Sequence, residues 1–133
     1  REVLGGEFRG RRITVLGATF KPDSDDVRDS PSLDVAVAMS NAGADVVVHD
    51  PKGLVNAERV YPHMTYVGDL TQALAGAELV VLGTEWREYR ELDPAGIAGV
   101  VAGRHVIDAR NALDPERWRN AGWSYRALGR PTA

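Results

Sequence analysis

Short apolar runs alternate with helix-like segments along most of this 133-residue chain. The runs expected to form strands are 12–17, 44–50, 78–83 and 105–109, with further candidates at 124–128 and 65–68. The first three are nearly continuous and rich in β-branched residues, a pattern typical of strands that are covered on both faces. Strands that alternate with helices form a parallel sheet joined by right-handed crossovers. The sequence therefore predicts an α/β fold, a three-layer Rossmann-like domain with a mostly parallel sheet.

Helix signals fall between the expected strands. Ser30 is placed to cap a helix, Pro31 suits its first turn, and the glycine of "AGA" (42–44) marks its end. Four further helices are expected, at 54–61, 69–77, 93–101 and 114–122. The last two begin with Asp-Pro, which combines an N-cap residue with a proline in the first turn.

The chain is long enough for one domain, because a chain of this size buries roughly two-thirds of its unfolded surface on folding. We expect this domain to span residues 11–129. Residues 1–10 then form a connector from upstream domains, and residues 130–133 form a tail. The chain begins with Arg1 rather than methionine, so we expect it to be a piece of a longer, cytoplasmic protein.

Composition narrows the classes of function. The net charge of −3 argues against a nucleic-acid or membrane-surface binder, since both need a basic face. The chain has no cysteine, which excludes disulfides, thiolate metal sites and a cysteine nucleophile within it. No apolar run approaches the ~18 residues of a membrane span, and the three histidines lack the spacing of a metal site. We therefore expect no nucleic-acid, membrane or metal partner.

Ligands of open parallel sheets bind beyond the carboxyl ends of the strands. Four stretches reach that edge of the predicted sheet: 18–30, 50–53, 84–90 and 108–114. The first turn, "LGATFKPD", has one glycine where a dinucleotide site needs about three. An anionic ligand would therefore be bound by side chains, and the candidates are Lys21, Arg28 and Arg110.

Each candidate also has a purely structural interpretation. Lys21 and Arg28 could neutralise the acidic residues of their own loop, which are Asp23, Asp25, Asp26 and Asp29. Arg110 could cap the following helix or pair with Asp108. The aromatic residues of "TEWREYREL" (84–92) could serve packing alone. The residues by themselves leave both interpretations open, and they establish an α/β domain with cationic side chains at one edge.

One segment, "GATFKPDSDDVRDSPSLDVAVAMSNAGADVVVHDP" (17–51), closely resembles the carboxy-terminal domain of the UDP-glucose/GDP-mannose dehydrogenase family. Members of that family carry the signature G-x-x-F-K-x-x-[ST]-D-D-x-R-x-S-P. Every position of it is filled here, by Gly17, Phe20, Lys21, Ser24, Asp25, Asp26, Arg28, Ser30 and Pro31. The stretches "TEWREYRELD" (84–93) and "VIDARNALD" (106–114) resemble two further family blocks in the same order, and the likeness covers about residues 8 to 128.

The resemblance implies a larger NAD-dependent enzyme. Family members have an amino-terminal Rossmann domain for NAD, a long central helix and a second Rossmann-like domain, which is the part found here. Their catalytic cysteine precedes this segment, and two successive oxidations turn the sugar C6 alcohol into a carboxylate. We therefore expect NAD as the cofactor, bound mainly by the absent domain. A UDP-sugar is the expected substrate, and a homodimer or larger assembly is the expected oligomeric state.

The resemblance also assigns roles to individual residues. Lys21, with Phe20 beside it, matches the family's contact to the UDP-sugar. Arg110 matches the arginine that holds the UDP portion, and Arg28 matches a residue that reaches across the cleft to NAD. The acidic pair at 25–26 is expected to fix the loop and orient Arg28. No catalytic residue is expected within this chain.

Two segments, "KPDSDDVR" and "TEWREYRELD", resemble the UDP-glucose branch of the family more than the GDP-mannose or UDP-N-acetylmannosamine branches. The resemblance therefore favours UDP-glucose as the nucleotide sugar. A UDP-N-acetylhexosamine or GDP-mannose dehydrogenase domain is the alternative within the family. Two other functions stay open: a stand-alone nucleotide-binding module, and a subunit-interaction domain whose charged loops form an interface.

Overall fold

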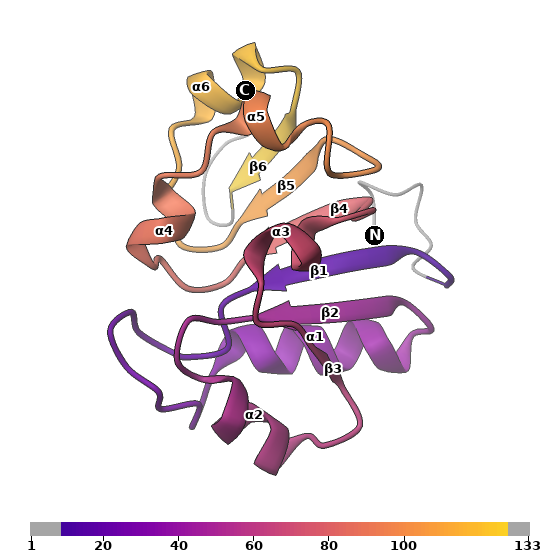
Figure 1. The fold of residues 1–133 in the computed structure, drawn as a ribbon, viewed down its shortest axis with the longest axis vertical. Coiled ribbons are helices and arrows are strands. Elements are labelled where there is room, and N and C mark those ends of the chain that lie inside the picture. Colours follow the sequence, from indigo (N-terminus) through magenta and orange to yellow (C-terminus); the bar gives the residue numbers. More distant parts are fainter. Residues whose placement is uncertain (1–8, 128–133) are drawn as a thin grey trace.

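The computed structural model describes residues 9–127. Within this range the sheet has six strands: β1 (Arg12–Leu16), β2 (Asp45–His49), β3 (Thr65–Tyr66), β4 (Leu79–Leu82), β5 (His105–Asp108) and β6 (Ser124–Ala127). They lie in the order β3-β2-β1-β4-β5-β6, and every pairing is parallel (Figure 1). The predicted Rossmann-like α/β fold is therefore confirmed. The sheet is parallel throughout the described residues.

The helices of the described residues connect these strands. They are α1 (Pro31–Asn41), α2 (Leu54–Val60), α3 (Leu70–Leu74), α4 (Arg87–Arg90), α5 (Pro94–Ile97) and α6 (Pro115–Asn120). Five of them fall where the sequence predicts a helix, although α3, α5 and α6 are shorter than expected. The short helix α4 was not predicted, because its segment was assigned to a loop.

Polar side chains cap α1, α3, α5 and α6 at the positions that the sequence indicates. The Ser30 hydroxyl accepts the backbone N–H of Leu33 at 3.2 Å, and Pro31 follows it as the first helical residue of α1. Asp69, Asp93 and Asp114 cap α3, α5 and α6 in the same way. Each cap satisfies a backbone donor that would otherwise lack a partner at the helix start.

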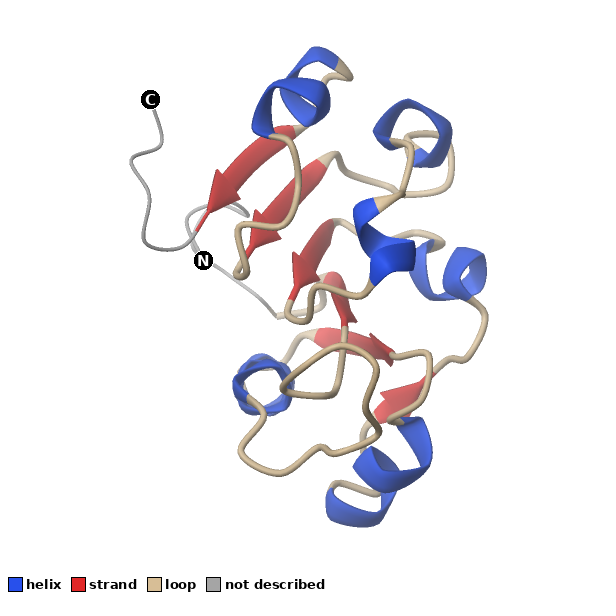
Figure 2. Ribbon diagram, turned by 90° about the vertical axis from the view of Figure 1, so that its left-hand side faces the viewer, coloured by secondary structure: helices blue, strands red, loops and turns tan. Residues whose placement is uncertain are grey.

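The sheet separates two hydrophobic clusters. Ile13 and Val15 of β1 pack with α1 and α2 on one face, while Leu16 packs on the other face with residues of α3, α4 and α6. Figure 2 shows the long helix α1 on one side of the strands and the helices between β3 and β6 on the opposite side. The molecule thus has the expected three layers, and no helix of residues 9–127 reaches the length and apolarity that a bilayer crossing requires.

The strand order reverses between β1 and β4, which are neighbours although β2 and β3 lie between them in sequence. In such sheets the crevice outside the carboxyl ends of the strands at this point is the usual ligand site. The loops that follow β1, β2, β4 and β5 all lie at this edge, on the left of Figure 1. The four stretches that the sequence placed at one edge are therefore together in space.

Two glycines bring the segments after β1 and β4 into close contact. Gly17 has a φ of +105°, and a Cβ atom there would lie 2.4 Å from the Thr84 hydroxyl. A Cβ atom on Gly83 would lie 2.0 Å from the hydroxyl of Ser32. That hydroxyl donates to the carbonyl of Gly17, so α1 is also tied to this point. The glycine that opens the family signature is thus needed for packing at the edge of the sheet.

Residues 1–8 of the expected connector, and residues 128–133 with the expected tail, lie outside the described residues. The domain limits of 11 and 129 stay a prediction.

The close approach at Gly17 makes a stability prediction. We expect Gly17→Ala to lower the free energy of unfolding by about 2–5 kcal/mol, because it combines left-handed strain with overpacking against Thr84. Gly76 is the matched control: its φ is +73° and no atom lies within 4 Å of its added Cβ, so Gly76→Ala should cost only about 1–2 kcal/mol. Urea unfolding measures both losses. Equal losses would contradict the packing role of Gly17.

Candidate functional site

Asp50 follows β2 directly and is almost fully buried. Its Oδ2 accepts the backbone N–H groups of Ala18 (2.8 Å) and Thr19 (3.2 Å) and the indole N–H of Trp86 (3.2 Å). Its Oδ1 accepts the backbone N–H groups of residues 52–53, at 2.9 and 2.6 Å. A buried carboxylate needs such partners to offset its lost hydration. Asp50 thereby joins the loops that follow β1, β2 and β4.

Thr84 and Trp86 fix the start of the segment after β4. The Thr84 hydroxyl donates to the carbonyl of Thr19 in the loop after β1. Trp86 and Tyr89 are both buried, as the packing interpretation of this segment expects. Their polar atoms also form hydrogen bonds, because Trp86 donates to Asp50 and the Tyr89 hydroxyl bonds to His49.

Asp108, the last residue of β5, is fully buried and shapes the loop after that strand. Its Oδ1 accepts the backbone N–H groups of Arg110 and Ala112, both at 3.1 Å. Its Oδ2 accepts the N–H of Leu113 at 2.9 Å and the Tyr125 hydroxyl at 2.7 Å. Asp108 therefore interacts with the backbone of Arg110, and its carboxylate orients the loop that carries the guanidinium.

The Arg110 side chain points to the loop after β1, where it meets Phe20. Its Nη2 donates to the Phe20 carbonyl at 2.9 Å, and its Cζ lies 5.5 Å from the centre of the Phe20 ring. The same Nη2 donates to Glu85 Oε1 at 2.9 Å. The guanidinium thus neither caps a helix nor pairs with Asp108, the two structural alternatives for it. The structure brings Phe20 and Arg110, two of the predicted site residues, into direct contact.

Lys21 follows Phe20 and is exposed. Within residues 9–127 it forms no ion pair within 4.0 Å, so the acidic residues of its loop do not neutralise it by direct contact. It lines a hollow of about 330 Å³ whose other walls come from residues 20–28 of the same loop. A cation with no paired carboxylate beside a hollow is available to an anionic ligand.

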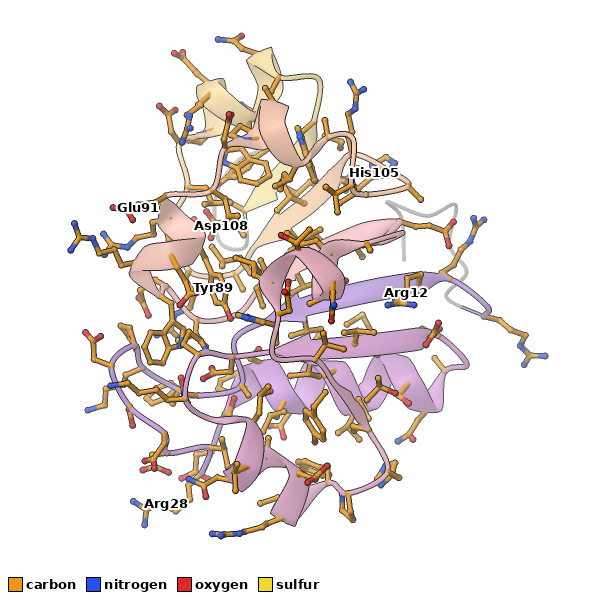
Figure 3. All side chains as sticks on the ribbon, viewed as in Figure 1. Arg12, Arg28, Tyr89, Glu91, His105 and Asp108 are labelled. Carbon is orange, nitrogen blue, oxygen red and sulfur yellow. The ribbon has the colours of Figure 1, made fainter. Side chains whose placement is uncertain are left out.

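Arg28 lies in the same hollow but is bound within its own loop. Its Nε and Nη2 reach the two carboxylate oxygens of Asp26 at 3.0 and 2.8 Å, and its backbone N–H donates to Asp26 Oδ1 at 2.9 Å. These bonds with Arg28 lower the pKa of Asp26 to about 2. Figure 3 shows Arg28 projecting away from the labelled residues Asp108 and Tyr89. Asp26 therefore orients Arg28, as expected, while the Arg28 side chain stays 87% exposed.

The loop after β1 is supported by its own residues and by α2. Ser24 accepts the backbone N–H of Asp26 at 3.0 Å, and the carbonyl of Asp25 accepts the amide of Asn56 in α2 at 2.8 Å. Asp23 and Asp29 both have positive φ, at 61° and 53°, a conformation that aspartate tolerates better than most residues. The acidic residues of the loop thus shape its backbone.

His49 and Tyr89 form a buried pair that the sequence did not indicate. Their Nδ1 and hydroxyl atoms are 2.6 Å apart, and the Tyr89 hydroxyl also donates to the carbonyl of His49 at 3.1 Å. Burial lowers the pKa of His49, although Glu88 and Asp50 oppose that effect. Burial also raises the pKa of Tyr89 well above its usual range. The pair joins β2 to α4, and its only sequence signal is a histidine at the end of an apolar run.

The first turn does not form a dinucleotide cradle. In dinucleotide-binding Rossmann domains, glycine amides and a helix N-terminus bind the pyrophosphate, and an acidic residue about 20 residues on binds a ribose. Here Asp50, at the end of β2, is occupied by protein donors. The described residues also contain no group of three or more histidine, cysteine, aspartate or glutamate side chains that could hold a metal ion. Positively charged side chains remain the groups suited to an anion.

Comparison with protein families gives a match over residues 14–115 to the model of the "UDP-glucose/GDP-mannose dehydrogenase family, UDP binding domain". The UDP-glucose 6-dehydrogenase of Rhizobium meliloti is 39% identical over 129 residues, which are 97% of this chain and 30% of that protein. The chain spans about 30% of the length of the curated relatives it matches first.

Two solved structures show the same domain. A UDP-glucose dehydrogenase from Pyrobaculum islandicum is 37% identical with a TM-score of 0.76, and the match covers 94% of this chain and 26% of that one. An NDP-N-acetyl-D-galactosaminuronic acid dehydrogenase from Methanosarcina mazei is 30% identical with a TM-score of 0.85. That second match covers 98% of this chain and 27% of the other.

The buried His49 makes stability depend on pH. Because its pKa is lowered in the folded state from the ordinary 6.5, the unfolded chain binds more protons below pH 6.5. The free energy of unfolding should therefore fall as the pH drops below 6.5, by at most about 1.4 kcal/mol per pH unit from this residue. Urea unfolding between pH 7 and 5 should show a shallower slope for His49→Gln, whereas His63→Gln, at an exposed histidine, should keep the parental slope. Parallel slopes for all three proteins would exclude His49 as the cause.

Proposed function

Because the chain belongs to the UDP-glucose/GDP-mannose dehydrogenase family, as its UDP-binding domain, we propose that it binds the nucleotide sugar of an NAD-dependent UDP-glucose 6-dehydrogenase. The full enzyme would oxidise UDP-glucose to UDP-glucuronate in two steps. The curated relatives at 32–39% identity are named for UDP-glucose, and this supports UDP-glucose over other nucleotide sugars. The cytoplasmic location and the assembly into a homodimer or larger oligomer belong to the same proposal.

One observation carries the proposal: the Arg110 guanidinium is held against Phe20 at the strand-order reversal. A diphosphate carries about two negative charges, and each charge-assisted hydrogen bond to it contributes about 1.5–3 kcal/mol. Arginine suits such oxygens because its planar fork offers several donors in a fixed arrangement. In our proposal Arg110 binds the diphosphate of the nucleotide.

Lys21 and Phe20 complete the proposed substrate contacts. Lys21, which forms no ion pair among residues 9–127, reaches the ligand from the loop after β1, while Phe20, 45% exposed, offers an apolar face beside it. These groups bind and orient the substrate. The oxidation itself is supplied by NAD and by residues outside this chain.

Arg28 is the proposed contact to NAD. It projects from the rim of the domain, and its exposed guanidinium is held by Asp26 alone among the described residues. A ligand bound mainly by another domain could be reached from this position without a cradle in this one. NAD would then lie between the two domains, with most of its contacts on the other.

The nucleotide-sugar role makes a kinetic prediction for Arg110. In the full-length enzyme, Arg110→Ala should raise the KM for UDP-glucose by about 10–100-fold, because it removes charged contacts to the diphosphate. The value of kcat should fall less, since the contact is also made in the ground state. Arg90→Ala is the control, because Arg90 is exposed on α4. An unchanged KM for Arg110→Ala would remove that residue from the substrate site.

A second prediction concerns the 133-residue chain by itself. We expect no NAD reduction when this chain is mixed with UDP-glucose and NAD, because it contains no cysteine to hold the sugar during oxidation. Absorbance of NADH at high protein concentration measures this directly. Turnover by the purified chain would refute the assignment of the chemistry to other parts of the enzyme.

A further inference from the structure

Glu85 is a charged residue of the site to which the sequence assigned no role. Its Oε1 lies 2.9 Å from Arg110 Nη2, and the two side chains are only 34% and 23% exposed. The same Nη2 donates to the Phe20 carbonyl at 2.9 Å, so both of its hydrogens are in use. The guanidinium cannot turn in its plane without breaking one of these bonds. Its Nε and Nη1 hydrogens have no acceptor among residues 9–127 and are free to meet a ligand.

The backbone at Glu85 is itself held in place from both sides. Thr84 donates to the Thr19 carbonyl, in the loop that also carries Phe20. Trp86 is buried and donates to Asp50 at 3.2 Å. The backbone of Glu85 therefore has a set position relative to the loop that carries Phe20. Its partly buried side chain then reaches Arg110 Nη2 from that position, and such a pair is less screened by water than an exposed ion pair.

We propose that Glu85 is a positioning residue of the nucleotide site, whose carboxylate sets the orientation in which Arg110 meets the diphosphate. This inference rests on the proposed function, because it needs Arg110 to be the diphosphate ligand. It assigns separate roles to the donors of the guanidinium: Nη2 donates to protein acceptors, while Nε and Nη1 donate to the substrate.

The carboxylate has two opposing effects on a diphosphate. It orients the guanidinium, which favours binding, and its negative charge repels the phosphates, which opposes binding. Substitutions separate the two effects. Glu85→Gln keeps an acceptor oxygen at the same reach without the charge, and Glu85→Asp keeps the charge but withdraws it by one methylene group. Glu85→Ala removes both.

Steady-state kinetics of the full-length enzyme with UDP-glucose and NAD test the proposal. If Glu85 positions Arg110, Glu85→Ala and Glu85→Asp should each raise the KM for UDP-glucose by about 3–10-fold, the scale of one hydrogen bond, with kcat within about twofold. Glu85→Gln should keep the KM within about twofold of the parent, or lower it, because the orienting acceptor remains and the repulsion is gone. Adding Glu85→Ala to Arg110→Ala should raise the KM no further, since the two residues act through one contact.

Glu91→Ala is the matched control. Glu91 also pairs with an arginine, Arg87 at 3.1 Å, but on the exposed surface of α4, and its loss should leave both kinetic constants unchanged. Glu85→Asp keeps the test valid if the alanine variant folds poorly. An unchanged or lowered KM for both Glu85→Ala and Glu85→Asp would overturn the proposal. If Arg110→Ala also leaves the KM unchanged, the proposed function fails; if Arg110→Ala raises it, only the role of Glu85 fails.

Discussion

The edge of the sheet that carries the site depends on one buried carboxylate. Asp50 accepts hydrogen bonds from the loops after β1 and β2 and from Trp86 after β4. A charge buried in this way is stable only while these donors surround it, so the three loops have to stay together. In dinucleotide-binding domains the acidic residue near this point contacts the ligand. Here it holds the loops, and under the proposed function the cations that those loops carry bind the ligand.

The fold could be predicted from the sequence because its signals are local. Continuous β-branched runs mark the buried parallel strands, and Ser30 and Asp114 cap their helices through bonds to residues only two or three positions away. Helix α4 could not be predicted in this way, because it begins after Trp86, whose side chain makes no cap bond. What holds that residue is burial and a bond to Asp50. This bond is a tertiary contact, and neither helix propensity nor hydrophobic periodicity predicts it.

The site was predictable only in part. The family signature and the "DAR" block pointed to Phe20 and Arg110, and the structure brings these two residues into contact. Glu85, the other partner of Arg110, was missed, because it lies 25 residues from Arg110 and meets it only when β4 and β5 pair. The sequence shows which cations are present. The acceptor that orients Arg110 depends on strand order and so emerges only from the folded chain, whereas Asp26 orients Arg28 from two positions away.

Arg110 and Arg28 differ in how firmly the protein holds their guanidinium groups before any ligand binds. Arg110 is mostly buried and is held by groups from the loops after β1 and β4. Arg28 is 87% exposed and is held by Asp26, which lies two positions away in its own loop. A preorganised donor loses little conformational freedom on binding, whereas an exposed one loses more. Under the proposed function, nucleotide affinity therefore resides in this domain through Arg110. A contact from Arg28 to NAD would gain strength only where the other domain presents NAD in a fixed position.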